Sequence, residues 1–310
     1  METFKHIFET HYTWIEGFMR NVRRYADRPA IIMPGKNLWT YSQMNREVNR
    51  LANALQQDGV GKGDVVMLQL LNCPEFAFCY IATQKIHAVS SPVSYRLSPG
   101  ELAKNLADTD PKVLIIDQRP EESVLEATRL SGKQPKRLII VDGPTTSHAT
   151  SYADYVRQAS DDEPRTGVPF NIYDETTRLF TSGTTGRAKA VPLTSINEVL
   201  SAHDVMIHFP MNYRDVTMNT TPWFHRGGLH CGGPCPTFYA GATMVIMPKF
   251  DADKTLQYVS RYKISFVVGV PTVLESLADE QERQGYDLHT LRGIVTMGSP
   301  LERGACIRYQ

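Results

Sequence analysis

Hydrophobic and polar residues follow two different periods along most of the chain. Residues 40–43 (TYSQ) are typical of a capping box, in which a hydroxyl and an amide satisfy the first backbone donors of a helix. Apolar residues then recur at positions 44, 48, 51 and 55, on one face of a helix. Gly59 suits the end of that helix, and the apolar run at residues 65–68 has the length of a buried strand.

The same alternation continues to the end of the chain. Ser98-Pro99-Gly100-Glu101 predicts a second helix start, with a proline at the first helical position and an end near Asp108. We expect further buried strands at residues 112–116, 137–141, 178–181, 243–247, 264–268 and 293–297, and helices at 196–208, 254–262 and 272–283. Apolar strands that alternate with helices indicate an α/β fold with a largely parallel sheet covered on both faces. The polar stretch 147–168 predicts a boundary between two α/β subdomains, residues 1–168 and 169–310.

Composition excludes several classes of protein. The 310 residues include 33 Lys plus Arg, 33 Asp plus Glu and 42% hydrophobic residues, unlike a disordered chain or a dedicated nucleic-acid-binding protein. No apolar run approaches the roughly 18 residues of a membrane span, and glutamates interrupt the apolar residues of the N-terminal segment. Five cysteines, thinly spread, fit a reducing compartment better than a disulfide framework. We therefore expect a cytoplasmic protein without an export signal or transmembrane segment.

The sharpest local feature is the segment 179–189 (LFTSGTTGRAK). A strand leads into six small residues, and a lysine closes the turn; these residues are Thr181, Ser182, Gly183, Thr184, Thr185, Gly186 and Lys189. Glycines allow a backbone to approach an anion, and hydroxyls and a lysine can bind phosphate oxygens. A Ser/Thr/Gly-rich surface loop with an incidental lysine would have the same composition. The spacing of the glycines and the lysine differs from that of the nucleotide-triphosphatase P-loop.

Several segments, in order along the chain, extend this observation. They are Asn72-Cys73-Pro74-Glu75-Phe76, residues 92–117, the loop 181–189, Thr221-Pro222-Trp223-Phe224-His225, Gly269-Val270-Pro271-Thr272 and Met297-Gly298-Ser299-Pro300-Leu301. Together they resemble the adenylate-forming superfamily, which includes AMP-producing acyl- and aryl-CoA synthetases, luciferases and peptide-synthetase adenylation domains. The resemblance implies the large N-terminal domain of that fold, with two mostly parallel sheets and helices on both faces.

The resemblance also implies a two-step reaction with ATP, Mg²⁺ and CoA. The carboxylate of a fatty or aryl acid attacks the α-phosphorus of ATP, and a thiol such as that of CoA then takes the acyl group. The loop from Thr181 to Gly186 and Lys189 would hold the β- and γ-phosphates. Gly298, Ser299 and Pro300 would border the adenine and the acyl pocket. Small molecules are the expected partners, and a homodimer is the expected assembly if there is one.

His225 is the candidate that the resemblance changes most. A lone histidine is more often packed in a core, but the resemblance places this one at the carboxylate site, where it would donate a hydrogen bond to the acid or gate ATP entry. We predict that His225 and Lys189 are catalytic. Amino-acid-activating relatives carry an aspartate at the position of His225, so an acid without an α-amino group is favoured. The remaining residues expected to line the acid pocket are Phe224, Gly227, Gly228, Val270 and Pro271.

The sequence also departs from the family pattern. Ala188 and Ala190 stand where proline and glycine are usual, which should alter loop stiffness rather than chemistry. The Tyr-Gly-x-Thr-Glu motif, whose Glu helps to hold magnesium, the ribose-binding aspartate and the C-terminal lysine are all missing, so we expect this chain alone to be incomplete. Three readings stay open: the N-terminal part of an acyl- or aryl-CoA synthetase, a ligase that passes the acyl group to a carrier protein, and a non-catalytic nucleotide- or acyl-binding module.

Metal-ligating residue types also gather in one short segment. His225, His230, Cys231 and Cys235 lie within eleven residues. Their spacing lacks the second ligand pair of a zinc template. The sequence therefore predicts no metal site.

Overall fold

The computed structural model describes residues 2–117, 121–143, 145, 147–181, 188–300 and 302–308. The chain forms two compact units, and each is discontinuous in sequence. Unit 1 comprises Met1–Gly17, Gln43–Leu71 and Glu75–Asn197, and unit 2 comprises Phe18–Ser42, Asn72–Pro74 and Glu198–Gln310. The boundary predicted at residue 168 is a single cut along the sequence, and it stays a prediction.

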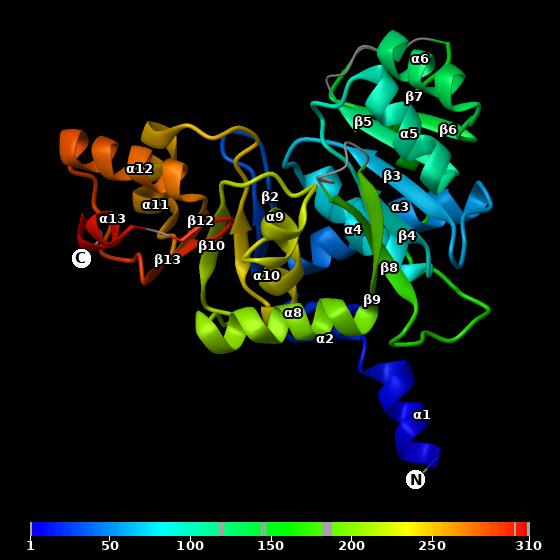
Figure 1. Cartoon of the computed structure of the whole chain (residues 1–310). Helices are drawn as coiled ribbons and strands as arrows, with labels where there is room; N and C mark the ends of the chain where they lie inside the picture. Colours follow the sequence, from blue (N-terminus) through cyan, green and yellow to red (C-terminus); the bar gives the residue numbers. More distant parts are fainter. Residues whose placement is uncertain are drawn as a thin grey trace. The chain divides into compact units, whose positions relative to one another are not determined.

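Unit 1 is built on a sheet with the strand order β7-β6-β5-β3-β4-β8-β9 (Figure 1). Its strands are β3 (Val65–Gln69), β4 (Val89–Pro92), β5 (Val113–Asp117), β6 (Arg137–Val141), β7 (Thr150–Ser151), β8 (Glu175–Thr181) and β9 (Lys189–Thr194). All neighbours are parallel except β8 and β9, which form an antiparallel pair at the edge. The sequence predicts the parallel centre, because its strands are continuous apolar runs separated by helices.

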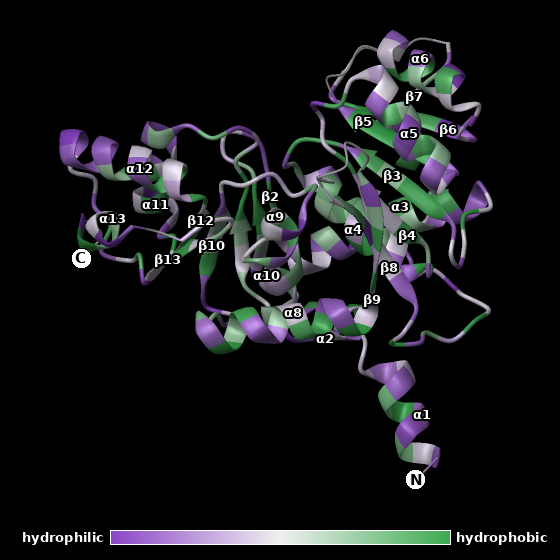
Figure 2. Ribbon diagram, viewed as in Figure 1, coloured by the Kyte–Doolittle hydropathy of each residue, from purple (hydrophilic) through white to green (hydrophobic). Residues whose placement is uncertain are grey.

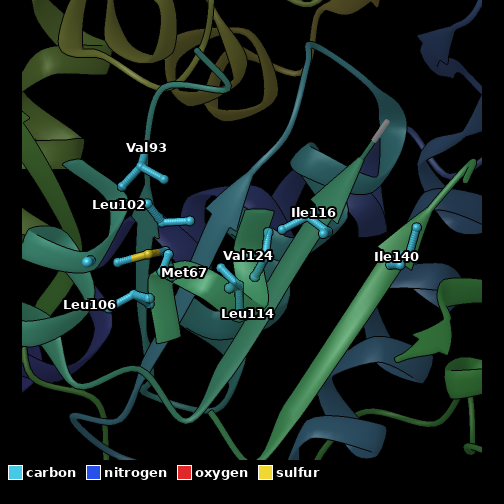
Figure 3. Close-up of a cluster of buried hydrophobic side chains, with 10 residues drawn as sticks. Met67, Val93, Leu102, Leu106, Leu114, Ile116, Val124 and Ile140 are labelled. Carbon is cyan, nitrogen blue, oxygen red and sulfur yellow. The ribbon is translucent and has the colours of Figure 1, made fainter. Parts of the chain in front are cut away.

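Both faces of this sheet are covered. Every residue of β3 and β5 is buried, and successive side chains of a strand point to opposite faces. On one face, Met67, Leu114 and Ile116 pack against helices α5 (Pro99–Thr109) and α6 (Glu121–Ser131), as Figure 3 shows. In Figure 2 these central strands are mostly hydrophobic in colour. The other helices assigned mainly to this unit are α1 (Glu2–His11), α3 (Tyr41–Gln57), α4 (Pro74–Lys85) and α7 (Tyr152–Val156).

Unit 2 is built on a sheet with the strand order β13-β12-β10-β11-β1-β2. Its strands are β1 (Pro29–Ile32), β2 (Leu38–Thr40), β10 (Val216–Asn219), β11 (Thr243–Val245), β12 (Phe266–Gly269) and β13 (Gly293–Thr296). Only β1 and β2 pair antiparallel. One hydrophobic cluster joins β10, β11 and β12 to helices α11 (Ala252–Tyr262) and α12 (Pro271–Gln284). The remaining helices assigned mainly to this unit are α2 (Trp14–Arg24), α8 (Ser195–His208), α9 (Arg226–His230), α10 (Pro234–Ala240) and α13 (Arg303–Arg308).

Most of the predicted elements are confirmed within one to three residues. Ser98 and Glu101 form the predicted capping box, with Pro99 in the first turn of α5. The polar stretch 147–168 is more ordered than a linker: it contains β7 and α7, and a strap, residues 160–165, that α3 binds through side-chain amides. Asn53 donates to the carbonyl oxygens of Ser160 and Asp162, at 2.8 and 2.9 Å.

None of the helices in the described part of the chain combines the length and the apolar character that a membrane span needs.

Candidate functional site

The candidate residues of unit 2 follow three neighbouring parallel strands. β10 leads into the turn that carries His225, β12 leads into Val270, and β13 leads into Gly298. Since β12 lies between β10 and β13 and all three are parallel, their carboxyl ends meet at one edge of the sheet. Ligand sites of open α/β sheets lie at this edge. The fold therefore gathers segments that lie up to 73 residues apart in the sequence, from His225 to Gly298.

Two buried asparagines hold the turn between β10 and α9. Asn72 donates to the carbonyl oxygen of Thr221 at 3.0 Å and accepts from the backbone N–H of Trp223 at 2.9 Å. Asn219 accepts from the N–H of Thr221 at 2.8 Å and donates to the carbonyl oxygen of Gly228 at 3.1 Å. Because each amide bonds through both its oxygen and its nitrogen, the turn has little freedom to move.

His225 is the N-cap of α9, and this position fixes the role of its ring. The Nδ1 atom accepts a hydrogen bond from the N–H of Gly228 at 3.2 Å. A neutral imidazole whose Nδ1 accepts carries its proton on Nε2. Burial lowers the pKa of His225 below its ordinary value, so the neutral form predominates at pH 7. The ring therefore presents an Nε2–H donor, and Phe224 lies edge-on to it with ring centroids 5.3 Å apart.

The space beside each of the two glycines that follow His225 is filled by a different kind of group. A Cβ atom on Gly227 would lie 2.4 Å from the Sδ atom of Met297 and 3.4 Å from the imidazole. Met297 follows β13, so this contact joins the histidine turn to the segment 297–300. A Cβ atom on Gly228 would lie 1.8 Å from the backbone oxygen of Pro222. The space at Gly228 is thus taken by the protein's own backbone, whereas the space at Gly227 is taken by a flexible side chain.

The third segment of the site is the start of α12. Val270 is the N-cap of this helix and Pro271 occupies its first turn. Gly298 has a φ of +87°, and a Cβ atom there would be 3.8 Å from Cγ1 of Val270. Ser299 and Pro300 follow as exposed residues.

Six of the predicted pocket residues are therefore gathered at one edge of the sheet of unit 2: Phe224, His225, Gly227, Gly228, Val270 and Gly298. Their roles in binding the acid stay predictions.

In unit 1, Thr181 and Lys189 are direct partners across the antiparallel pair β8 and β9. Directly opposite residues place their side chains on the same face of a sheet. Both are exposed, and Lys189 forms no ion pair with any residue that the structure describes. Ser182, Gly183, Thr184, Thr185 and Gly186 lie outside the described residues. The last described pair of these two strands is thus a threonine opposite a lysine.

Sequence reasoning did not find every residue that forms this site. The family resemblance includes Asn72 without giving it a role, and no sequence pattern indicates a role for Asn219 at this site. What marks both residues is a buried side-chain amide that bonds to the turn, and this is known only from the structure. The contact of Met297 with Gly227 likewise depends on the neighbouring order of β10, β12 and β13.

Comparison with known families agrees with this geometry. The model of the family described as "AMP-binding enzyme" matches residues 18–310. The chain belongs to the AMP-binding enzyme family. The match includes the histidine turn, the hairpin of β8 and β9, and the segment 297–300.

Curated relatives of this AMP-binding chain are CoA ligases. A 4-coumarate–CoA ligase of Humulus lupulus is 28% identical over 292 residues, which cover 91% of this chain and 52% of the relative. A feruloyl-CoA synthase of an Amycolatopsis species is 30% identical over 287 residues, covering 92% and 54%. The chain therefore spans about half the length of the curated relatives that it matches.

Solved structures show the same fold. The N-terminal domain of FACL13 from Mycobacterium tuberculosis has a TM-score of 0.82 and 28% identity, covering 96% of this chain and 72% of that chain. The anthranilate CoA ligase AuaEII, in complex with anthranoyl-AMP, has a TM-score of 0.89 at 23% identity, covering 97% and 57%. The AMP-binding chain thus has the N-terminal fold of adenylate-forming enzymes, as predicted.

Proposed function

We propose that the protein carrying this chain activates a carboxylic acid with ATP and transfers the acyl group to CoA. An oxygen of the acid attacks the α-phosphorus of ATP, the bond from that phosphorus to pyrophosphate breaks, and an acyl-adenylate forms. The thiol of CoA then attacks the acyl carbon, and AMP leaves. The family match and the CoA-ligase relatives support this proposal.

The observation that carries the proposal is the fixed tautomer of His225. Its Nδ1 accepts from the N–H of Gly228, so its Nε2–H is available as a donor at the carboxyl edge of the sheet. A neutral donor can orient a carboxylate without neutralising its charge, so the carboxylate keeps its strength as a nucleophile. We infer that His225 orients the acid in this way and that Phe224 and Met297 border the acyl group.

We further propose that the hairpin of β8 and β9 binds the phosphates of ATP. Lys189 is an exposed cation opposite Thr181, and an ammonium beside the departing pyrophosphate would stabilise its growing charge. Magnesium would neutralise phosphate charge in the same step. None of the described residues assigned to this site is a carboxylate, so we assign no magnesium ligand within this chain.

A panel of carboxylic acids scored by ATP–pyrophosphate exchange tests the proposal on the full-length protein. The panel should pair hydroxycinnamic acids, as in the named relatives, with fatty acids and with α-amino acids. We expect exchange with at least one acid that lacks an α-amino group, and a strong loss in Lys189→Ala. Exchange only with amino acids, or unchanged exchange in Lys189→Ala, would refute the assignment. A CoA thioester among the products identifies the acceptor.

A further inference from the structure

Unit 2 contains a buried cluster of three metal-ligating side chains, none of which is assigned to the acid or phosphate site. Glu198 lies on α8, His230 ends α9 and Cys235 lies on α10, and all three are at most 2% exposed. One ligand atom from each lies within 4.8 Å of the other two. Nε2 of His230 is 2.7 Å from Oε2 of Glu198, and Sγ of Cys235 donates to the backbone oxygen of Glu198 at 3.4 Å.

We propose that Glu198, His230 and Cys235 bind a single zinc-like divalent cation. A carboxylate, an imidazole and a thiolate are the three ligand types that zinc takes in proteins. Metal–ligand bonds of about 2.0–2.3 Å in a tetrahedron put ligand atoms roughly 3.3–3.8 Å apart. The three ligand atoms already lie within 4.8 Å of one another, so side-chain movements of up to about 1 Å would give them tetrahedral spacing. The 2.7 Å contact between Nε2 and Oε2 would widen, and the fourth position would be open to water.

Charge balance is compatible with a bound divalent ion. The carboxylate and the thiolate together carry two negative charges, and the imidazole is neutral when it ligates, so a divalent cation makes the filled site neutral. A neutral assembly is what a fully buried position requires, because uncompensated charge is costly there. Within the described part of the chain, Nδ1 of His230 is also buried without a hydrogen-bond partner, so protein groups alone do not complete this ring's bonding.

The spacing of histidines and cysteines within residues 225–235 fits no zinc template. Glu198 comes from a helix that begins thirty residues earlier in the chain, so no spacing pattern could include it. Cys231 is adjacent to His230 in sequence but is not one of the three clustered residues. An ion bound to these three side chains would tie α8 and α10 to α9, the helix that His225 caps. The proposal does not rest on the acid-activating function.

Metal content after refolding tests the proposal, because a fully buried site fills most readily while the chain folds. The chain is unfolded in urea with a chelator, refolded with or without zinc, desalted and measured by elemental analysis. We expect about one zinc per chain and a higher urea midpoint for the zinc-refolded protein. Refolded protein without stoichiometric zinc would overturn the proposal.

Cobalt and matched cysteine variants separate this site from adventitious binding. Refolding with Co²⁺ should give the absorption of a tetrahedral site and a thiolate charge-transfer band. Cys235→Ser should lose the band and bind zinc at least tenfold more weakly, on the order of the loss for a metal-site change. Two control variants should keep the cobalt band and the zinc affinity. They are Cys231→Ser, at a cysteine four residues before Cys235, and Cys79→Ser, at a buried cysteine of unit 1. Absence of the band in the unaltered chain refutes the proposal even if Cys235→Ser does not fold.

Discussion

Substituting alanine at the two adjacent glycines of α9 should have very different effects on stability. A Cβ atom on Gly228 would lie 1.8 Å from the oxygen and 2.5 Å from the carbon of the Pro222 carbonyl, and real Cβ contacts are essentially never below 3.0 Å. The obstacle is backbone, and the hydrogen bonds of Asn72 and Asn219 hold that turn in place. Relief requires the backbone to move by about 1.2 Å, so we expect a cost at or above the top of the 1–3 kcal/mol range for overpacking, about 3 kcal/mol or more.

Gly227→Ala is the matched control for that substitution. Its added Cβ atom would meet the Sδ atom of Met297 at 2.4 Å, but a thioether at the end of a flexible side chain can rotate away. Alanine also gains about 1 kcal/mol over glycine in a helix, which offsets part of the cost. We therefore expect a net change within about 1 kcal/mol.

Urea unfolding of the 310-residue chain, followed by tryptophan fluorescence and circular dichroism, measures both variants. The free energy of unfolding should fall by about 3 kcal/mol or more for Gly228→Ala and by less than about 1 kcal/mol for Gly227→Ala. Equal effects, or a larger loss for Gly227→Ala, would refute the packing described here. A Gly227→Ala variant with intact stability but altered acid preference would support the proposed acyl pocket.

Substitutions at three further positions test other parts of the structure. His225→Asn keeps an acceptor for the N–H of Gly228 but loses the Nε2–H donor, so pyrophosphate exchange should fall while the urea midpoint changes little. His225→Ala also removes the acceptor at the N-cap of α9, so it should in addition lower the free energy of unfolding by about 1 kcal/mol. Asn72→Ala removes two buried hydrogen bonds and should cost about 2–4 kcal/mol in urea unfolding; a loss below about 1 kcal/mol would contradict its role in holding the turn. Burial raises the pKa of Glu163, but the charge of Lys85 and the hydrogen bonds from Lys85, Asn45 and Asn49 outweigh it, so the folded-state pKa is lowered. The stabilisation is therefore fully present above the ordinary pKa of a glutamate and is lost as the pH falls through the lowered folded-state pKa. Glu163→Gln should therefore lower the free energy of unfolding by about 1–2 kcal/mol at pH 7, a figure discounted because Glu163 is half-exposed. The difference in urea midpoint between the variant and the unaltered chain should narrow in acid. A difference independent of pH would contradict the ion pair.

The parallel centres of both sheets could be predicted because their physical signal is local. A buried parallel strand is a short apolar run, and β3 and β5 each stand out as such a run between two helices. The start of α5 was also predictable, since a capping box uses only residues 98–101. These features need no knowledge of distant parts of the chain.

Features that depend on distant partners could not be predicted. β1 and β2 precede most of unit 1 in sequence but pair within unit 2, and β1 lies beside β11. β9 is half-exposed at a sheet edge, so it lacks a continuous apolar run. Residues 160–165 look like a linker by composition, yet amides of α3 bind their backbone.

Some residues of the candidate site could be identified from the sequence, and others only from the structure. His225, Lys189 and the glycines beside them were identified through their resemblance to family motifs. Glu198, Asn72 and Asn219 act through contacts across the fold, and no spacing in the sequence indicates those contacts. The roles of these residues therefore follow from their neighbours in the folded structure and not from the order of motifs in the sequence.

Transfer of a heavy-oxygen label tests the central claim most directly. The full-length protein is given a carboxylic acid labelled in both carboxylate oxygens, with ATP, Mg²⁺ and CoA, and the AMP is analysed by mass spectrometry. Attack of the carboxylate on the α-phosphorus predicts that each AMP carries one labelled oxygen, because the bridging oxygen stays with AMP when the thiol takes the acyl group. AMP without the label, formed at the same rate as the thioester, would contradict an acyl-adenylate mechanism.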